Sequence, residues 1–161
     1  MAREGISLLD ALREELGARS VKDGCSPQGQ CGCCTVLVDG APRVACVTPV
    51  RRVAGRSVTT VEGLDPEISA RLVGAFVKHG ASQCGFCTPG ILCRLAALGP
   101  SPDPTRVETA LLAHLCRCTG WRTIVDAATG GSGGVASAPG SISARRALIE
   151  GRVEQRVGAE V

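Results

Sequence analysis

Short apolar segments separated by polar loops mark the first third of the chain. Directly after Ser7, which begins a Ser-x-x-Asp capping box, four leucines recur at helical spacing and predict one buried helix face. These residues are Leu8, Leu9, Leu12 and Leu16. Gly17 is placed to end this helix, and residues 24–34 are too rich in Gly and Pro for regular structure, so they predict a loop.

A β-hairpin is predicted after this loop. Thr35 to Val38 is a short run of strand-forming residues, and Asp39-Gly40 is a typical two-residue hairpin turn. Arg43 to Thr48 then predicts the returning strand, and Val58 to Val61 predicts a further one.

Helical patterns replace the strands beyond Leu64. Four helices are predicted: Pro66 to Lys78, Pro89 to about Leu98, Thr105 to Leu115 with a capping box between Thr105 and Glu108, and about Thr119 to Ala128. The predicted fold class is therefore α+β, with a small mixed unit over residues 1–64 and an all-helical unit over residues 65–129. Residues 130–161 predict a Gly/Ser-rich linker followed by a charged tail.

Composition suggests that burial alone does not hold these two units together. Aromatic residues make up only 2% of the 161 residues, whereas the chain contains 10 cysteines. The first ten residues lack a hydrophobic signal core, which predicts a cytoplasmic protein whose thiols stay reduced and serve metal or redox chemistry. No apolar run approaches a membrane span, and the net charge of +3 comes without a dense basic patch, so neither a membrane nor nucleic acid is an expected partner.

Two close cysteine pairs lie in the helical unit. Cys84 and Cys87 form a C-x2-C pair, and Cys116 and Cys118 form a C-x-C pair after the intervening helices. Four thiolates brought together in this way suit a soft tetrahedral metal, either zinc or the irons of an iron–sulfur cluster.

A second group of four cysteines lies upstream in the pattern C-x5-C-x2-C-x11-C. Its members are Cys25, Cys31, Cys34 and Cys46. Three thiolates on one Gly-rich loop and a fourth on the following strand is the plant-type arrangement for a [2Fe–2S] cluster. Gly24, Gly29 and Gly32 would let backbone N–H groups approach the cluster sulfurs, because glycine has no Cβ.

Beyond these spacings, several long motifs occur in a fixed order. They are D-G-C, C-G-x-C-T-V-L-V-D-G, Q-C-G-F-C-T-P-G and L-C-R-C-T-G-W-x-x-I-V-D-A. Over about residues 7–129 the chain resembles the small iron–sulfur subunit of the xanthine dehydrogenase family of molybdenum hydroxylases. This resemblance implies a plant-type ferredoxin-like β-grasp domain followed by a four-helix bundle. Each domain would carry one [2Fe–2S] cluster on one of the two cysteine groups above.

The resemblance also implies a function within a hetero-oligomer. In that family a large subunit holds the molybdenum–pterin centre, and electrons pass through the two clusters, usually to FAD on a third subunit. Gln83 matches a family position whose side chain contacts the pterin. The sequence itself shows no nucleophile–base pair, phosphate-binding loop or paired acid–base carboxylates, so we expect the chain to be inactive alone.

Three features depart from the family pattern. The first motif has five residues rather than four between Cys25 and Cys31. Only Met1 to Ile6 precede the first helix, where the family has a β-hairpin, so the sheet is expected to be incomplete or completed by a partner chain. The end of the tail faintly resembles the leading segment of the large molybdenum subunit.

Less specific interpretations exist for the same residues. The chain could be a free-standing two-cluster carrier, or a zinc-structured binding module without redox function. Cys33 and Cys93 are expected to be buried space-fillers. His79 and His114 are expected at the surface or as helix caps rather than as ligands.

Overall fold

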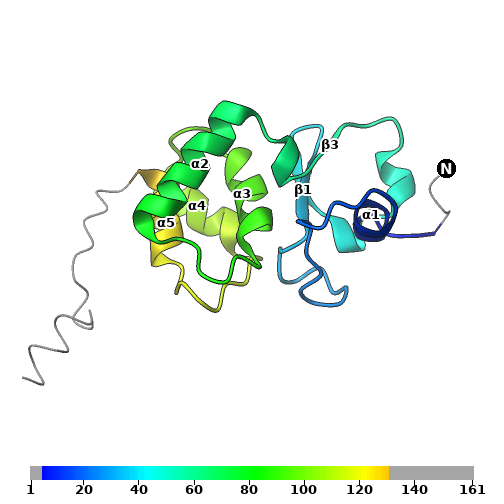
Figure 1. Cartoon of the computed structure of the whole chain (residues 1–161), viewed down its shortest axis with the longest axis horizontal. Coiled ribbons are helices and arrows are strands. Elements are labelled where there is room, and N and C mark those ends of the chain that lie inside the picture. Colours follow the sequence, from blue (N-terminus) through cyan, green and yellow to red (C-terminus); the bar gives the residue numbers. More distant parts are fainter. Residues whose placement is uncertain (1–4, 131–161) are drawn as a thin grey trace, which may run out of the picture.

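The computed structural model describes residues 5–130, which form a mixed α+β structure. A small antiparallel sheet and the first helix lie on one side, and four helices lie on the other, as Figure 1 shows. Strand β1 (Thr35–Val38) and helix α3 (Thr88–Ala96) are in direct contact where the two parts meet.

The first helix starts as predicted. Helix α1 (Leu8–Asp10) has a full capping box, because the Asp10 N–H donates to Ser7 Oγ at 3.1 Å and the Ser7 N–H donates to Asp10 Oδ2 at 3.4 Å. It continues as one wider π-helical turn, Ala11–Glu15, whose last bond runs from Leu16 N to Ala11 O. The extra residue in this turn rotates Leu16 away from the core. The prediction that Leu16 is buried is therefore wrong: it is 75% exposed.

Three antiparallel strands make up the sheet, in the order β2-β1-β3. They are β1 (Thr35–Val38), β2 (Ala41–Val44) and β3 (Val58–Thr59). Asp39 and Gly40 both have positive φ, 49° and 76°, which confirms the predicted two-residue turn. The predicted return strand over Arg43 to Thr48 has the wrong bounds. Strand β2 starts at Ala41, and the chain leaves it after Val44 for a 3-10 turn, Ala45–Val47.

Four helices follow the sheet: α2 (Pro66–His79), α3 (Thr88–Ala96), α4 (Pro104–Leu111) and α5 (Arg122–Thr129). Three predicted boundaries are wrong. Helix α4 is capped by Asp103, whose carboxylate accepts from the Thr105 N–H, so the predicted Thr105/Glu108 box is not used. The chain also leaves the helix after Leu111 instead of Leu115, because the Leu115 N–H donates to the carbonyl of Cys31 at 2.9 Å. Helix α5 starts at Arg122 rather than at about Thr119.

Two apolar cores hold the parts together. The first lies between α1 and the sheet and includes Leu8, Leu9, Val36 and Val38. The second lies among the four helices and is built from Leu72, Phe76, Ala81, Ile91, Leu92, Leu95, Val107, Leu111, Ile124, Ala127 and Ala128. All four residues of β1 are buried, because one face meets the first core and the other meets α3.

Truncation of Ile91 tests the helical core. Ile91 is fully buried, so Ile91→Ala should lower the free energy of unfolding by about 2–5 kcal/mol. Val77→Ala on the exposed side of α2 is the control, because Val77 is 78% exposed and its truncation should cost within about 0.5 kcal/mol. Urea unfolding followed by circular dichroism measures both, and similar losses in the two variants would contradict the packing described.

Candidate metal centres

The hairpin brings the first cysteine group together. Thr35 pairs with Val44 across β1 and β2, so Cys46, two residues beyond Val44, lies beside Cys34, one residue before Thr35. Two backbone contacts fix this arrangement: Ala45 N–H donates to Cys34 O at 3.2 Å, and Cys46 N–H lies 3.4 Å from Cys34 Sγ. The upstream loop supplies the remaining thiols of this group.

Thiols of the first group approach one another in pairs. The Cys25 thiol lies beside Cys31, which also lies beside Cys33, and the Cys34 thiol lies beside Cys46. Burial acts to raise the pKa of Cys25, but the backbone N–H groups of Gln30, Cys31 and Gln28 outweigh it and lower this pKa to about 6. Burial raises the pKa of Cys46 to about 12, and the adjacent Cys34 thiol adds to the rise.

The three glycines of this loop lie in different surroundings. A Cβ on Gly24 would lie 2.9 Å from Cys31 Sγ and 3.2 Å from Phe86 Cε1. Gly29 packs on the Val47 side chain, and its N–H contacts the Cys46 thiol. At Gly32 the nearest atoms are those of His114 and Ala113, so the space beside this glycine is taken by the helical part.

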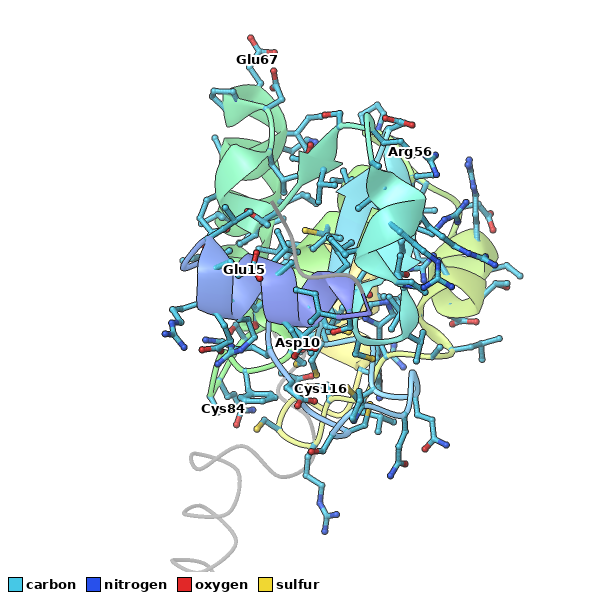
Figure 2. All side chains as sticks on the ribbon, turned by 90° about the vertical axis from the view of Figure 1, so that its right-hand side faces the viewer. Asp10, Glu15, Arg56, Glu67, Cys84 and Cys116 are labelled. Carbon is cyan, nitrogen blue, oxygen red and sulfur yellow. The ribbon has the colours of Figure 1, made fainter. Side chains whose placement is uncertain are left out.

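The second group gathers two loops at one end of the helices. Cys84 and Cys87 lie in the loop before α3, and Cys116 and Cys118 lie between α4 and α5. The thiols again associate in twos, Cys84 with Cys118 and Cys87 with Cys116. Cys84 and Cys118 are exposed, and Figure 2 shows Cys84 near Cys116 at the end of the view opposite Glu67.

Polar side chains surround this second group. The Gln83 amide nitrogen donates to Cys118 O at 2.9 Å, which holds the exposed Gln83 side chain beside the thiols. The Thr119 hydroxyl lies 3.1 Å from Cys116 Sγ. Burial acts to raise the pKa of Cys116, but hydrogen bonds from Thr119 and the Cys118 backbone lower it below its usual value.

The two groups lie against each other across the boundary between sheet and helices. The Leu115 N–H, next to Cys116, donates to the carbonyl of Cys31. Gly90 of α3 packs on the Gly32–Cys33 backbone so closely that a Cβ there would lie 2.3 Å from Gly32 O. Burial raises the pKa of Cys33 to about 12, and the nearby thiols of Cys31, Cys87 and Cys34 add to the rise. Cys33 therefore lies close to thiols of both groups. The expectation that Cys33 and Cys93 are buried is confirmed.

His114 also lies at this boundary, and the prediction of a surface or capping position for it is wrong. It is 2% exposed, not at the surface, and its Nε2 accepts a hydrogen bond from Arg94 Nε at 3.3 Å. Burial and then the Arg94 charge lower the pKa of His114 to about 4, so the imidazole is neutral at pH 7. The only sequence signal for this position was its distance of two residues from Cys116, which gives no hint of burial.

Zinc and a [2Fe–2S] cluster place different demands on four thiolates. A single tetrahedral zinc ion needs four thiolates around one point, whereas the two irons of a [2Fe–2S] cluster spread four thiolates over two centres. Within residues 5–130 no three His, Cys, Asp or Glu side chains are gathered as one metal ion requires. The nearest thiol neighbours in each group are compatible with two ligands on each iron of a binuclear cluster.

Comparison with known proteins also indicates a [2Fe–2S] cluster. The profile of the [2Fe-2S] binding domain family matches residues 60–129. The nicotine 6-hydroxylase small subunit of Paenarthrobacter nicotinovorans is 44% identical over 144 residues, which are 88% of this chain and 81% of that one. The crystal structure of quinoline 2-oxidoreductase from Pseudomonas putida 86 superposes with a TM-score of 0.72 at 44% identity, covering 80% of this chain and 81% of the other.

The chain belongs to the iron–sulfur small subunits of the xanthine dehydrogenase family. Members of this family are subunits of oxidoreductase complexes, and [2Fe–2S] is their cofactor. The aldehyde oxidoreductase of Megalodesulfovibrio gigas is 47% identical over 127 residues, which are 74% of this chain but only 14% of that protein. None of the helices between residues 5 and 130 has the length and apolar character needed to cross a membrane.

Two helix glycines provide a test of the boundary in this family member. Helix propensity alone predicts that Gly→Ala stabilises a helix by about 1 kcal/mol. Gly74→Ala in α2 should follow this rule, because nothing lies within 4 Å of the new methyl group. Gly90→Ala in α3 should instead destabilise the protein by about 1–3 kcal/mol, because the methyl group meets the Gly32–Cys33 backbone.

Thermal unfolding of the iron-loaded full chain measures both effects. We expect the change in stability to be positive for Gly74→Ala and negative for Gly90→Ala. Stabilisation by Gly90→Ala would show that α3 does not lie against the first loop.

Proposed function

We propose that this chain is the electron-transfer subunit of a molybdenum hydroxylase, relaying electrons from a molybdopterin centre on a partner subunit through two [2Fe–2S] clusters toward FAD or another acceptor. The observation that carries the proposal is the presence of two four-thiol groups, each in two pairs, on loops that contact each other. A [2Fe–2S] cluster in each group supplies a redox centre with a potential tuned by its hydrogen bonds and exposure.

The thiol contacts suggest which residues hold each iron. Cys25 and Cys31 would hold one iron of the first cluster, and Cys34 and Cys46 the other. In the second cluster, Cys84 would share an iron with Cys118, and Cys87 with Cys116. This division is supported by which thiols are nearest neighbours, because each iron of such a cluster takes two protein ligands.

The contact between the loops supports a relay within the chain. One hydrogen bond of 2.9 Å, from Leu115 N–H to Cys31 O, links the residue next to Cys116 with a thiol-bearing residue of the first group. The Cys33 thiol lies 3.6 Å from the same Cys31 carbonyl. A short, buried connection of this kind keeps solvent out of the space between the two groups.

Exposure of the second group suggests where the molybdenum subunit docks. Cys84 and Cys118 are exposed, whereas Cys31, Cys34 and Cys46 are buried. Gln83 is held beside Cys118 with its side chain at the surface, which suits the proposed contact with the pterin of the partner. The outer face of this group is therefore the proposed entry point for electrons.

The rest of the proposal concerns the assembly. We propose a plant-type ferredoxin-like domain over residues 1–64, a four-helix domain over residues 65–129, and a linker and tail over residues 130–161, which lie mostly outside the described residues. A large molybdenum subunit and a FAD subunit would complete a cytoplasmic hetero-oligomer. The chain supplies no substrate pocket in this proposal and has no catalytic activity alone.

Single cysteine substitutions test the two-cluster proposal. The full chain should contain about four iron and four sulfide and show two EPR signals on reduction. Cys25→Ser and Cys118→Ser should each remove about half of the iron and one signal, a different one in each case. Cys33→Ala, which removes a neighbouring thiol outside the proposed set, should keep both signals. Stoichiometric zinc without iron would contradict the proposal. Co-purification of the iron-loaded chain with a molybdenum-containing subunit would distinguish a subunit of a complex from a free carrier.

Thr119 offers a test of how the protein tunes the second cluster. Its hydroxyl contacts Cys116 Sγ, and hydrogen bonds to cluster sulfurs stabilise the reduced, more negative state. Thr119→Val should therefore lower the reduction potential of the second cluster and leave that of the first unchanged. Thr109→Val is the matched control, because the Thr109 hydroxyl bonds only to Thr105 O within α4. Redox titration monitored by EPR measures the reduction potentials of both clusters in each variant. An unchanged potential of the second cluster in Thr119→Val would refute this role of Thr119.

A further inference from the structure

His114 lies where three segments of the chain meet. It follows α4 and precedes Leu115, whose N–H bonds to Cys31 O. Its imidazole is 2% exposed, and only one other polar side chain, Thr35, is as deeply buried among the described residues. A buried polar ring needs a partner to offset its lost hydration.

One side of the ring is held by helix α3. The Arg94 Nε–H donates to His114 Nε2 at 3.3 Å, and Arg94 forms no salt bridge within the described residues. Arg94 lies four residues beyond Gly90, the glycine that packs on the Gly32–Cys33 backbone. The same helix therefore contacts both the imidazole and the loop of the first thiol group.

The other side of the ring lies against that loop. A Cβ on Gly32 would lie 2.4 Å from His114 Nδ1 and 2.6 Å from its Cγ, so the ring occupies the space above this glycine. Gly32 is the residue between Cys31 and Cys33. Nδ1 has no hydrogen-bond partner within the described part of the chain, so its contact with Gly32 is one of packing.

From these contacts we infer that His114 is a positioning residue that fixes the separation and orientation of the two thiol groups. The inference depends on the proposed function, because it concerns the coupling between clusters held by both groups. The imidazole fills the space between the Gly32 peptide and Arg94, and this keeps the Leu115 N–H in register with Cys31 O. A smaller side chain leaves a void there, and the two loops are then free to shift relative to each other.

Substitutions in the iron-loaded full chain test this role. His114→Ala should retain both EPR signals but weaken the spin–spin splitting between the reduced clusters, because dipolar coupling falls steeply with distance. His114→Gln keeps an acceptor for Arg94 and much of the volume, so it should restore the splitting. His79→Ala, which removes the only other histidine, is the matched control and should match the wild type.

Hydrogen exchange gives a second readout that does not depend on electron transfer. The peptide containing Leu115 should exchange about tenfold faster in His114→Ala than in the wild type, the effect of losing about one net hydrogen bond. The same peptide should be unaffected by His79→Ala. Mass spectrometry on the full chain measures this exchange.

The outcomes separate the inference from the proposed function. A wild-type chain without two clusters would defeat the proposed function itself. Two coupled clusters in the wild type, with unchanged splitting and Leu115 exchange in His114→Ala, would overturn only the role of His114. If His114→Ala binds less iron, His114→Asn decides, because it also shortens the side chain but leaves a smaller void beside Gly32. In that variant weaker splitting supports the inference, and wild-type splitting overturns it.

Discussion

Direct packing of one short backbone stretch, Gly32–Cys33, against the helical part determines the geometry of both thiol groups. Gly90 of α3 and the His114 side chain both pack against this stretch. Both contacts need a residue without a side chain at the point of approach, and both involve loops that have no regular structure of their own. Because protein interiors are close-packed, neither loop can move without disturbing the other. The loops that carry the two candidate metal centres are thus packed directly against each other.

The two groups differ in their access to solvent, and this difference has chemical consequences. Three thiols of the first group are buried, whereas two thiols of the second are exposed. Burial disfavours the charged thiolate, as the raised pKa of Cys46 reflects, and backbone N–H groups around Cys25 oppose this effect. An exposed group beside a partner and an enclosed group behind it give the proposed relay a direction, from the surface near Gln83 into the interior.

Local signals in the sequence predicted much of this structure. The Asp39-Gly40 turn and the Ser7 capping box depend on neighbouring residues only, and the structure has both. Long-range contacts were not predictable in the same way. The chain leaves α4 at Leu111 because Leu115 bonds to Cys31, more than eighty residues away, and His114 is buried by the same contact. Cysteine spacing indicated which thiols belong to each group, but only the folded chain shows how they divide into pairs.

Anomalous diffraction at the iron absorption edge, on crystals of the full chain isolated without exposure to air, tests the central claim most directly. The account predicts two pairs of iron atoms, one between the Cys25/Cys31 and Cys34/Cys46 thiols and one between the Cys84/Cys118 and Cys87/Cys116 thiols. A single metal ion at the centre of each group, or iron bound at only one group, would contradict it.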